Sequence, residues 1–371
     1  MTLPEHTSGW IIQGTAPNDG SAALVWKHNL DLPKLSEHDV LVQFHAWSLN
    51  YPEIATLSSR VTNHIHKLTA VQVATGIYPW KQDDPTGIPG SDAAGEVVYV
   101  GSGVKNLTVG DRVFPIYYPN FDFGSAPTVE TGRGVCGLDA PGVFCEYAIF
   151  DQRALSKMPK NLSYKEAATF PCSALAAWNA LYGYNPIRPG SWVLVQGTGG
   201  VSMFAIQFAV AAGASVIATT SSEAKATLLR KMGVKHIINY KEDQEWGETA
   251  RKLTPGGLGC DHVIEVGGPA TIRQSFQCVA RGGVINVIGF LAGQTQGPED
   301  PTFLEPLVRA CVVRGVEVGS RQQLEDMIKA IECQDVKPVL DSVEFSLKEL
   351  KRVYERVWKR EHFGKAVITG I

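Results

Sequence analysis

One segment near the middle of the chain restricts the possible fold more than any other. An apolar run at residues 192–196 leads directly into a glycine-rich turn at residues 197–200, and a helical pattern follows over residues 201–212. A second apolar run covers residues 215–219. A strand, a glycine turn, a helix and a second strand form a βαβ unit, and the N-terminus of its helix can bind a pyrophosphate group. The segment therefore predicts a dinucleotide-binding fold.

The end of the second strand indicates which dinucleotide is preferred. NAD-binding folds usually carry an Asp or Glu there, which hydrogen-bonds the ribose 2′-hydroxyl. This chain has Ser221 and Ser222 instead, with Lys225 one turn into the next helix. Hydroxyl groups and a cation suit a 2′-phosphate, which a carboxylate would repel. The nearby acid, Glu223, fits the first turn of a helix that has Ser222 as its N-cap. The sequence therefore favours NADP(H) over NAD(H).

Length and composition exclude several classes of protein. A chain of 371 residues is long for one domain, so two domains are expected. The net charge of −3 comes without a run of like charges, so nucleic acid is not an expected partner. Residues 1–9 lack the apolar core of a secretory signal, and no apolar run has the length of a membrane span. We expect a small-molecule substrate and no membrane partner.

The cysteines indicate a reducing compartment. The chain has 7 of them, dispersed and never in a Cys-x-x-Cys pair. This pattern is typical of free, mostly buried thiols and does not match a zinc ribbon. A cytoplasmic location is therefore expected.

Two kinds of periodicity divide the chain. The first ~155 residues alternate in the manner of strands, as at residues 40–46 and 94–101, with glycine turns between them, which predicts a partly closed barrel. From about residue 163, helical and strand patterns alternate, which predicts a doubly wound sheet. Its expected strands lie at residues 192–196, 215–219, 236–240, 262–266 and 284–288. Near the C-terminus, one helical stripe contains Leu347, Leu350, Val353, Tyr354 and Val357.

Ordered motifs along most of the chain resemble those of one superfamily. They are Asn50-Tyr51, the stretches at residues 89–97, 110–113, 167–172, 195–202 and 238–240, and the closing His362-Phe363-Gly364-Lys365. The chain resembles a medium-chain dehydrogenase/reductase of the zinc-independent alcohol dehydrogenase-like and quinone oxidoreductase-like branch. The resemblance implies an α/β protein, with a Rossmann-type doubly wound parallel sheet at residues 159–321. It also implies a GroES-like β-barrel catalytic domain at residues 1–158, completed by residues 322–371.

The resemblance also implies a set of residues that bind the cofactor. They are the turn residues Gly197, Thr198, Gly199, Gly200 and Val201; the 2′-phosphate contacts Ser221, Ser222, Lys225 and Tyr240; Gly267, Gly289, Phe290 and Gly319 after later strands; and Lys365 from the other domain. Simpler interpretations stay open for some of them. Tyr240 could be a strand-end aromatic residue, Lys365 a surface lysine, and the glycines ordinary turn residues. Ser202 stands where the fingerprint expects its last glycine, and its small side chain should still allow close packing.

Three residues are candidates for catalysis. In this branch, Asn50 and Tyr51 lie beside the nicotinamide, although Asn-Tyr-Pro could also simply end a strand. Tyr78 matches a proton-donating Tyr of related enoyl-thioester reductases, although a Tyr before Pro is often only packed. Residues 57–73 look like an addition relative to the family. They could be a loop that shapes the substrate site, or a gene-model error that would also change the placement of Tyr78.

The expected metal ligands are missing. Zinc-containing relatives have a Cys near the position of Asn50 and a Gly-His-Glu motif where this chain has Gly90-Ser91-Asp92. Ser is a poor zinc ligand, and the pair His64 and His66 has no partner Cys. We expect no bound metal. Developing negative charge on a substrate oxygen would then be stabilised by hydrogen-bond donors.

Together these features predict a zinc-independent, NADPH-dependent oxidoreductase. Its expected reaction is hydride transfer to an activated double bond or carbonyl of the enone, enal, enoyl or quinone type. One alternative is an NADP-dependent alcohol dehydrogenase that acts on a secondary alcohol or ketone. Another is a non-catalytic NADPH-binding sensor. The resemblance also implies a homodimer formed by edge strands near residues 314–318, unless that edge is covered or charged.

Overall fold

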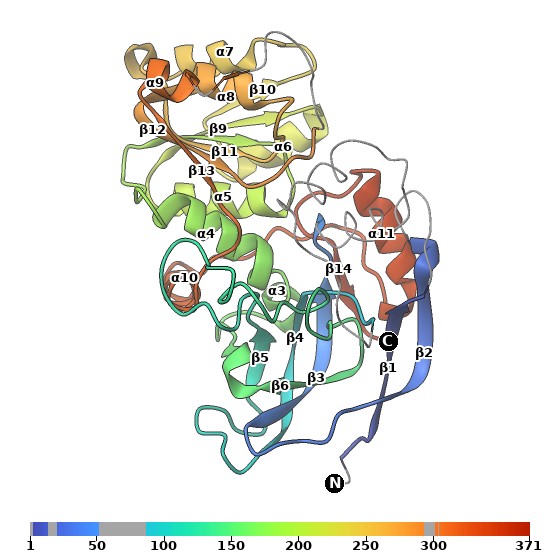
Figure 1. Ribbon diagram of the computed structural model, residues 1–371. Helices are drawn as coiled ribbons and strands as arrows, with labels where there is room; N and C mark the ends of the chain where they lie inside the picture. The colour runs from blue at the N-terminus through green and yellow to red at the C-terminus, as the bar shows by residue number, and fades with distance from the viewer. Residues whose placement is uncertain (1–2, 14–20, 52–86, 293–300, 303) are drawn as a thin grey trace. The chain divides into compact units, whose positions relative to one another are not determined.

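The computed structural model describes residues 3–13, 21–51, 87–292, 301–302 and 304–371 (Figure 1). Contacts divide the chain into two compact units. The first contains residues 1–173 and 319–371, and the second contains residues 174–318. The sequence placed the domain boundaries near residues 158 and 322. In the structure, residues 159–173, including the short helix α3 (Tyr164–Ala167), belong to the first unit.

The second unit contains a six-stranded parallel sheet, as the alternating pattern predicts. Its strands are β8 (Trp192–Gln196), β9 (Ser215–Thr220), β10 (His236–Asn239), β11 (Cys260–Glu265), β12 (Val279–Val287) and β13 (Val312–Gly315). Their order across the sheet is β10-β9-β8-β11-β12-β13. In order of appearance along the chain this is 3-2-1-4-5-6, the order of a dinucleotide-binding sheet. The direction of winding reverses between β8 and β11, so a ligand is expected above the carboxyl ends of these two strands.

Helices cover both faces of this sheet. On one face lie α4 (Leu175–Tyr182) and α5 (Gly200–Ala211), and on the other lie α7 (Trp246–Lys252) and α8 (Ile272–Cys278) (Figure 1). The unit also contains α6 (Glu223–Lys231) and α9 (Glu305–Arg309). Trp246 and Phe276 pack into an apolar cluster with Leu194, Ile217 and Ile285 of the strands. Strands buried on both faces explain why their sequences read as continuous apolar runs.

The first unit is built on antiparallel strands, also as expected. A six-stranded sheet contains β3 (Asp39–Ser48), β4 (Asp92–Val100), β5 (Arg112–Pro115), β6 (Tyr147–Asp151), β7 (Leu155–Lys157) and β14 (Val367–Thr369). A separate hairpin pairs β1 (His6–Ile12) with β2 (Leu24–Asp31). The last strand, β14, joins the sheet beside β3, so the C-terminal segment completes this unit.

The close approach of the neighbouring strands β3 and β4 requires a glycine. A Cβ atom added to Gly95 would lie 2.1 Å from the backbone oxygen of Gln43. No side chain fits at that distance, so Gly95 lets the two backbones approach. This constraint accounts for a glycine in the middle of a strand, where it would otherwise cost stability.

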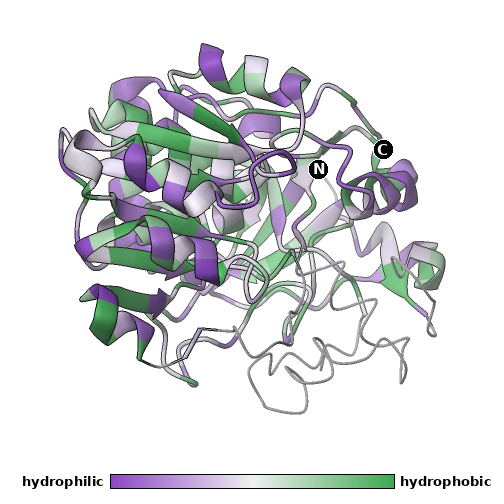
Figure 2. Ribbon diagram, turned by 90° about the horizontal axis from the view of Figure 1, so that it is seen from above, coloured by the Kyte–Doolittle hydropathy of each residue, from purple (hydrophilic) through white to green (hydrophobic). Residues whose placement is uncertain are grey.

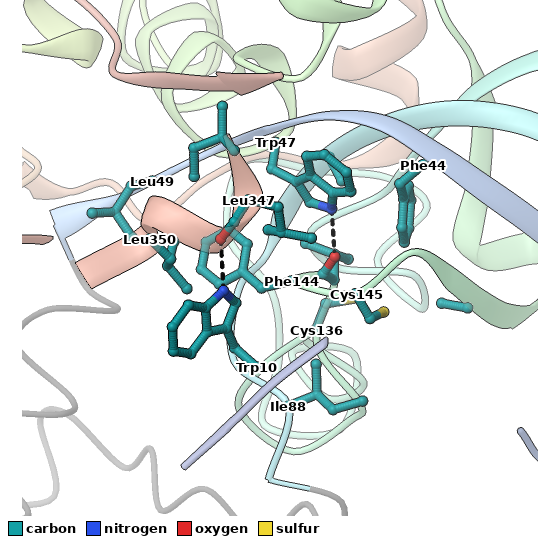
Figure 3. Packing of buried hydrophobic residues seen from close by; sticks show 14 of the residues in the cluster. Trp10, Phe44, Trp47, Leu49, Ile88, Cys136, Phe144, Cys145, Leu347 and Leu350 are labelled. Atoms are coloured by element: carbon teal, nitrogen blue, oxygen red, sulfur yellow. Dashed lines mark hydrogen bonds between the residues drawn. The ribbon is translucent and has the colours of Figure 1, made fainter. Parts of the chain in front are cut away.

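The core of the first unit is aromatic and aliphatic. Two buried indole groups are also hydrogen-bonded, because Trp10 donates to the Leu347 oxygen and Trp47 to the Val143 oxygen, both at 2.7 Å (Figure 3). The helix α11 (Leu350–Trp358) follows a 3₁₀ turn that starts at Leu347, and α10 (Arg321–Gln334) precedes it in the chain. The predicted helical stripe is confirmed, because its members are buried: Leu347, Leu350, Val353, Tyr354 and Val357.

Hydropathy follows this burial. Green, hydrophobic segments run along the strands, whereas the outer helices carry many purple segments (Figure 2). Within the described residues, no helix is both long enough and apolar enough to cross a membrane.

Candidate functional site

The turn between β8 and α5 has the geometry expected of a phosphate-binding turn. Gly197 has a φ of +70°, and a Cβ added to Gly197 or Gly199 would have no heavy atom within 4 Å. Gly199 is the N-cap of α5, so no side chain caps the helix. Thr198 is buried beside it, and Gly200 and Val201 form the first helical positions. The first N–H groups of this helix are therefore free of side-chain caps and can donate hydrogen bonds to the pyrophosphate of a nucleotide.

Ser202 takes the place of a glycine without disturbing this turn. Its side chain is buried, and its Oγ donates to the oxygen of Gln196 at 2.7 Å. The hydroxyl therefore ties the first turn of α5 to the end of β8. This contact supports the expectation that a small polar side chain is tolerated here.

The predicted 2′-phosphate residues gather beyond the carboxyl ends of β9 and β10. Ser222 is the N-cap of α6, and Ser221 and Lys225 are half-buried. Tyr240 lies on the neighbouring strand end, where its N–H donates to the oxygen of Thr220 at 3.1 Å. Its side chain is exposed. The four residues thus follow directly after β9 and β10, on neighbouring strands of the sheet.

Glu223 has a partner of its own. Its carboxylate accepts a hydrogen bond from the Arg230 guanidinium at 2.6 Å, further along the same helix. Both side chains are exposed. This pairing fits the interpretation of Glu223 as a residue of the first helical turn.

Two polar side chains meet between β8 and β11, where the winding of the sheet reverses. Gln196 ends β8 and Glu265 ends β11, and the two strands are hydrogen-bonded neighbours. The Gln196 amide nitrogen donates to Glu265 at 2.6 Å, and its amide oxygen accepts from the N–H of Val266 at 3.2 Å and of Gly267 at 3.1 Å. These bonds link the two strand ends that border the expected nucleotide site.

Glu265 is a fully buried carboxylate with several further donors. It accepts from the N–H of Gly267 at 2.7 Å and of Gly268 at 2.8 Å, and from the hydroxyls of Thr271 at 2.6 Å and Ser275 at 2.5 Å. A buried charge requires such compensation, because it has lost its water. Glu265 thus fixes the loop that follows β11 and the start of α8.

This network explains Gly267 and adds two residues that sequence reasoning missed. The Gly267 N–H points to Gln196 and Glu265, so its visible role is to shape the loop. The two missed residues, Gln196 and Glu265, share one signal in the sequence. Each is a polar residue directly at the end of an otherwise apolar buried strand.

Three other residues were predicted to bind the cofactor, and the structure places two of them beside the loop that follows β11 and the third in the first unit. Gly289 follows β12, and a Cβ added to it would lie 2.9 Å from the oxygen of Val266. Phe290 is half-buried beside Gly268, whose added Cβ would lie 2.7 Å from the Phe290 Cα. Gly319 is buried at the start of the C-terminal segment of the first unit. The structure thus brings Gly267, Gly289 and Phe290 together, whereas Gly319 belongs to the other unit.

The first unit contains a buried polar centre. It consists of Asn50, Ser91, Asp92, Ser173 and Lys365, whose side chains are almost completely inaccessible. The Lys365 ammonium donates to the Asn50 side-chain oxygen at 2.6 Å and lies 3.6 Å from an Asp92 carboxylate oxygen. Asn50 also accepts from the Ser173 hydroxyl at 3.1 Å and donates to the Ser91 hydroxyl at 3.2 Å. Lys365 is therefore an interior residue of this unit.

Opposing effects act on the Asp92 carboxyl group. Burial raises its pKa above the usual range, while the Lys365 ammonium and the Asn50 amide act against that rise. Each effect favours one protonation state, because low polarity disfavours the charged form and a nearby cation favours it.

The polar centre does not have the chemistry of a zinc site. Its side chains offer an amide, two hydroxyls and one carboxylate, whereas zinc in proteins is held by Cys, His and carboxylate ligands. The Lys365 ammonium beside Asn50 would also repel a divalent cation. Across the described parts of the chain, no three or more His, Cys, Asp or Glu side chains are grouped closely enough to hold a metal ion. His64, His66, Tyr78 and the extra segment at residues 57–73 lie outside the described residues.

Tyr51 directly follows Asn50 and is half-buried. Burial raises the pKa of its phenol, and the nearby positive charge of Arg360 acts in the opposite direction. The phenol therefore stays protonated at neutral pH and can act as a proton donor. Arg360, just beyond the end of α11, has a φ of +57° and was not predicted as part of the site.

The strand order and the glycine turn before α5 define a fold of the dinucleotide-binding type, and comparisons with known proteins identify a family of oxidoreductases. Residues 36–160 match the alcohol dehydrogenase GroES-like domain, and residues 200–332 match the zinc-binding dehydrogenase family. A zinc-type alcohol dehydrogenase-like protein of Schizosaccharomyces pombe is 40% identical over 90% of this chain and 92% of its own length.

Two further similarities extend this result. The crystal structure of a putative alcohol dehydrogenase from Sinorhizobium meliloti has a TM-score of 0.83 and 34% identity, covering 99% of this chain and 100% of that chain. A crotonyl-CoA carboxylase/reductase of Cereibacter sphaeroides is 29% identical over 78% of this chain and 71% of its own length. The chain belongs to the medium-chain dehydrogenase/reductase superfamily, whose members use a nicotinamide cofactor.

We expect Glu265→Gln to destabilise the second unit by about 1–3 kcal/mol. Both carboxylate oxygens of Glu265 now accept hydrogen bonds, and the NH₂ group of a glutamine would replace one of them and face the same donors. The change should also weaken dinucleotide binding. Chemical denaturation and fluorescence titration with NADPH would measure the two effects. Glu248→Gln is the matched control, since the Glu248 side chain is exposed and contacts the exposed Lys252, and its effect should stay within about 0.5 kcal/mol. Equal effects of the two changes would contradict this role of Glu265.

Proposed function

We propose that this protein is a zinc-independent, NADPH-dependent oxidoreductase that reduces an activated double bond or carbonyl. Substrates of the enone, enal, enoyl or quinone type fit this proposal. The observation that carries it is the donor set of the buried polar centre. That centre contains an ammonium group, and the amide of Asn50 and the hydroxyl of Ser91 stand at positions that resemble the metal ligands of zinc-containing relatives, with the Asp92 carboxylate beside them. Such donors suit a substrate whose reduction places negative charge on an oxygen atom.

The preference for NADPH rests on the residues beyond β9. The hydroxyl groups of Ser221 and Ser222 and the ammonium of Lys225 suit a 2′-phosphate. The neighbouring acid, Glu223, is already paired with Arg230, so a ribose 2′-hydroxyl would have to compete for it. Bound NADPH would supply the hydride, and the protein residues would position the substrate and supply a proton.

Tyr51 is the proton donor that we assign among the described residues. Tyr51 follows Asn50 in the chain, and the raised pKa of its phenol keeps the proton in place at neutral pH. A general acid of this kind can protonate the enolate or alkoxide formed by hydride addition. The Asn50 amide and backbone N–H groups would stabilise the same negative charge before the proton arrives.

The names of relatives support reduction of a conjugated alkene and also an alternative. One relative is called a crotonyl-CoA carboxylase/reductase, and others are called alcohol dehydrogenases. We therefore keep an alcohol dehydrogenase and a non-catalytic NADPH-binding sensor as outcomes of the assay below.

We also propose that the protein forms a homodimer through β13. This strand ends the parallel sheet at one edge, and its Val313 is 39% exposed. An uncovered edge strand can pair with a second copy of the same strand.

The proposed activity is tested by following NADPH oxidation with a panel of enones, enals, quinones and ketones, with and without a strong chelator. We expect chelator-resistant reduction of a conjugated alkene. Loss of activity on chelation would overturn zinc independence. Oxidation of secondary alcohols with NADP, without alkene reduction, would identify an alcohol dehydrogenase. Tight NADPH binding without turnover of any compound would support the non-catalytic sensor instead of an enzyme.

Lys225→Ala should raise the Kd for NADPH by about 10- to 100-fold and leave the Kd for NADH nearly unchanged, because only NADPH carries the 2′-phosphate. Fluorescence titration with each cofactor measures both constants. Lys231→Ala is the control, since Lys231 is an exposed lysine at the other end of the same helix. Equal weakening of both cofactors by Lys225→Ala would contradict the 2′-phosphate assignment.

The pH dependence of kcat tests Tyr51 as the acid. Removing the nearby cation by Arg360→Gln should raise the Tyr51 pKa further, so the decline of kcat on the alkaline side should move to higher pH. Tyr51→Phe should lower kcat by about 100-fold or more and abolish that alkaline decline. Arg352→Gln, which removes an exposed cation of α11, is the control and should leave the profile in place. A profile that moves to lower pH in Arg360→Gln would refute the assignment.

A further inference from the structure

A row of polar side chains crosses one face of the parallel sheet in the second unit. Arg314 of β13 belongs to it, and its guanidinium donates to the Asn179 Oδ1 of α4 at 2.9 Å. Asn286 of β12 is the register partner of Arg314. His262 of β11 pairs with Val284, two residues before Asn286. Because alternate residues of a strand share one face, His262, Asn286 and Arg314 all lie on the face that α4 covers.

Two members of this row carry buried polar atoms that lack a hydrogen-bond partner among the described residues. Asn286 is 0% exposed and His262 is 1% exposed. In the part of the chain that the structure describes, the Asn286 Oδ1, the Asn286 Nδ2 and the His262 Nδ1 each have no partner. Buried polar atoms are nearly always hydrogen-bonded, because they have lost their water. Three such atoms on neighbouring strands therefore indicate a partner other than the described side chains.

The direct neighbours of these side chains on the strands are mostly apolar. His262 lies between Val193 of β8 and Val284 of β12, and Ile264 of β11 is a register partner of Asn286. All three of these neighbours are buried. Valine and isoleucine side chains have no polar atoms, so they cannot bind the orphaned atoms of His262 and Asn286.

The three atoms determine what kind of group can bind them. The Asn286 Nδ2 only donates, its Oδ1 only accepts, and a neutral imidazole accepts or donates at Nδ1 according to its tautomer. An anion would satisfy Nδ2 and leave Oδ1 facing a negative charge. A cation would do the reverse and would also meet the positive charge of Arg314 beside Asn286. Water both donates and accepts, so water alone among these suits all three atoms.

The His262 ring carries no charge that would attract an ion. Burial lowers the pKa of His262, the Asp261 carboxylate opposes this effect, and the Arg314 guanidinium adds to it. A pKa below the ordinary histidine value leaves the ring neutral at pH 7. A neutral imidazole between apolar neighbours forms a good hydrogen bond with water and gives an anion no stabilising charge.

We propose that an internal water molecule binds between β11 and β12, hydrogen-bonded to the His262 Nδ1 and to the Asn286 side chain. The two residues are diagonal neighbours on adjacent strands, so one small molecule can reach both. Water held at this site connects two interior strands of the sheet on the face that α4 covers. The inference is independent of the proposed function, because it concerns neither the cofactor nor the substrate.

Diffraction tests the identity of the bound group. Crystals of the unmodified protein, soaked in bromide, should show a peak within about 3.2 Å of the His262 Nδ1 and of an Asn286 side-chain atom. We expect no anomalous bromide signal at this peak. A bromide signal there would identify an anion site and overturn the proposal. The absence of a peak, or a protein group in its place, would overturn it as well.

Substitution tests the water bridge in solution. If the buried atoms had no partner at all, Asn286→Leu and His262→Phe would each raise the Tm, because each removes an unpaired polar group. With a bridging water, we expect each change to lower the Tm by about 2–4 °C. The double variant should then lose about as much as one single variant, because either change releases the same water. A raised Tm in both single variants, or fully additive losses, would overturn the proposal.

His236→Phe is the control for replacing a histidine ring in this sheet. His236 of β10 is half-buried and stacks on Trp192 with ring centroids 5.9 Å apart, a contact that a phenyl ring can also make. We expect its Tm to stay within about 1–2 °C of the unmodified protein. A loss equal to that of His262→Phe would show that the ring exchange itself is responsible, and would contradict the water bridge.

Discussion

A charged group remains in a protein interior only when fixed dipoles replace the water that it has lost, and each unit of this chain is organised around one such charge. In the second unit this charge is the Glu265 carboxylate. It accepts hydrogen bonds from side chains of β8 and α8 and from the backbone of the loop that follows β11. In the first unit it is the Lys365 ammonium, which is surrounded by oxygen atoms from three separate segments, at residues 49–50, Asp92 and Ser173. The donors and acceptors around each charge cannot move without leaving it uncompensated.

This constraint places rigid structure where binding and chemistry are expected. Glu265 and Gln196 lie at the ends of the two strands between which the winding of the sheet reverses. The glycine turn before α5 begins directly after Gln196, and Ser202 ties the helix back to the same residue. A nucleotide at this edge would meet a surface whose shape is fixed before binding, which lowers the cost of ordering it.

The polar centre of the first unit is the part of this chain that bears most directly on the proposed chemistry. The chain belongs to the medium-chain dehydrogenase/reductase superfamily, and its residues 200–332 match a family described as zinc-binding dehydrogenase. Its own side chains at the positions that resemble the zinc ligands and their motif are the Asn50 amide, the Ser91 hydroxyl and the Asp92 carboxylate, with the Lys365 ammonium against the amide. Function therefore follows from the donor set of the site, and the fold alone does not decide it.

The sequence by itself determined the element types, the two architectures and the glycine turn before α5, because these depend on local periodicity and on glycines close together in the chain. The apolar runs predicted β8 to β12 within a few residues, and the sixth strand, β13, completed the sheet. Only the tertiary structure decided the polar networks. Gln196 and Glu265 are 69 residues apart, and Asn50 and Lys365 are 315 residues apart. No local pattern reports a contact between such distant residues, and a polar side chain has no periodic signal of its own. Whether Lys365 is a surface lysine or an interior cation depends on the pairing of β14 with β3, which long-range packing alone establishes.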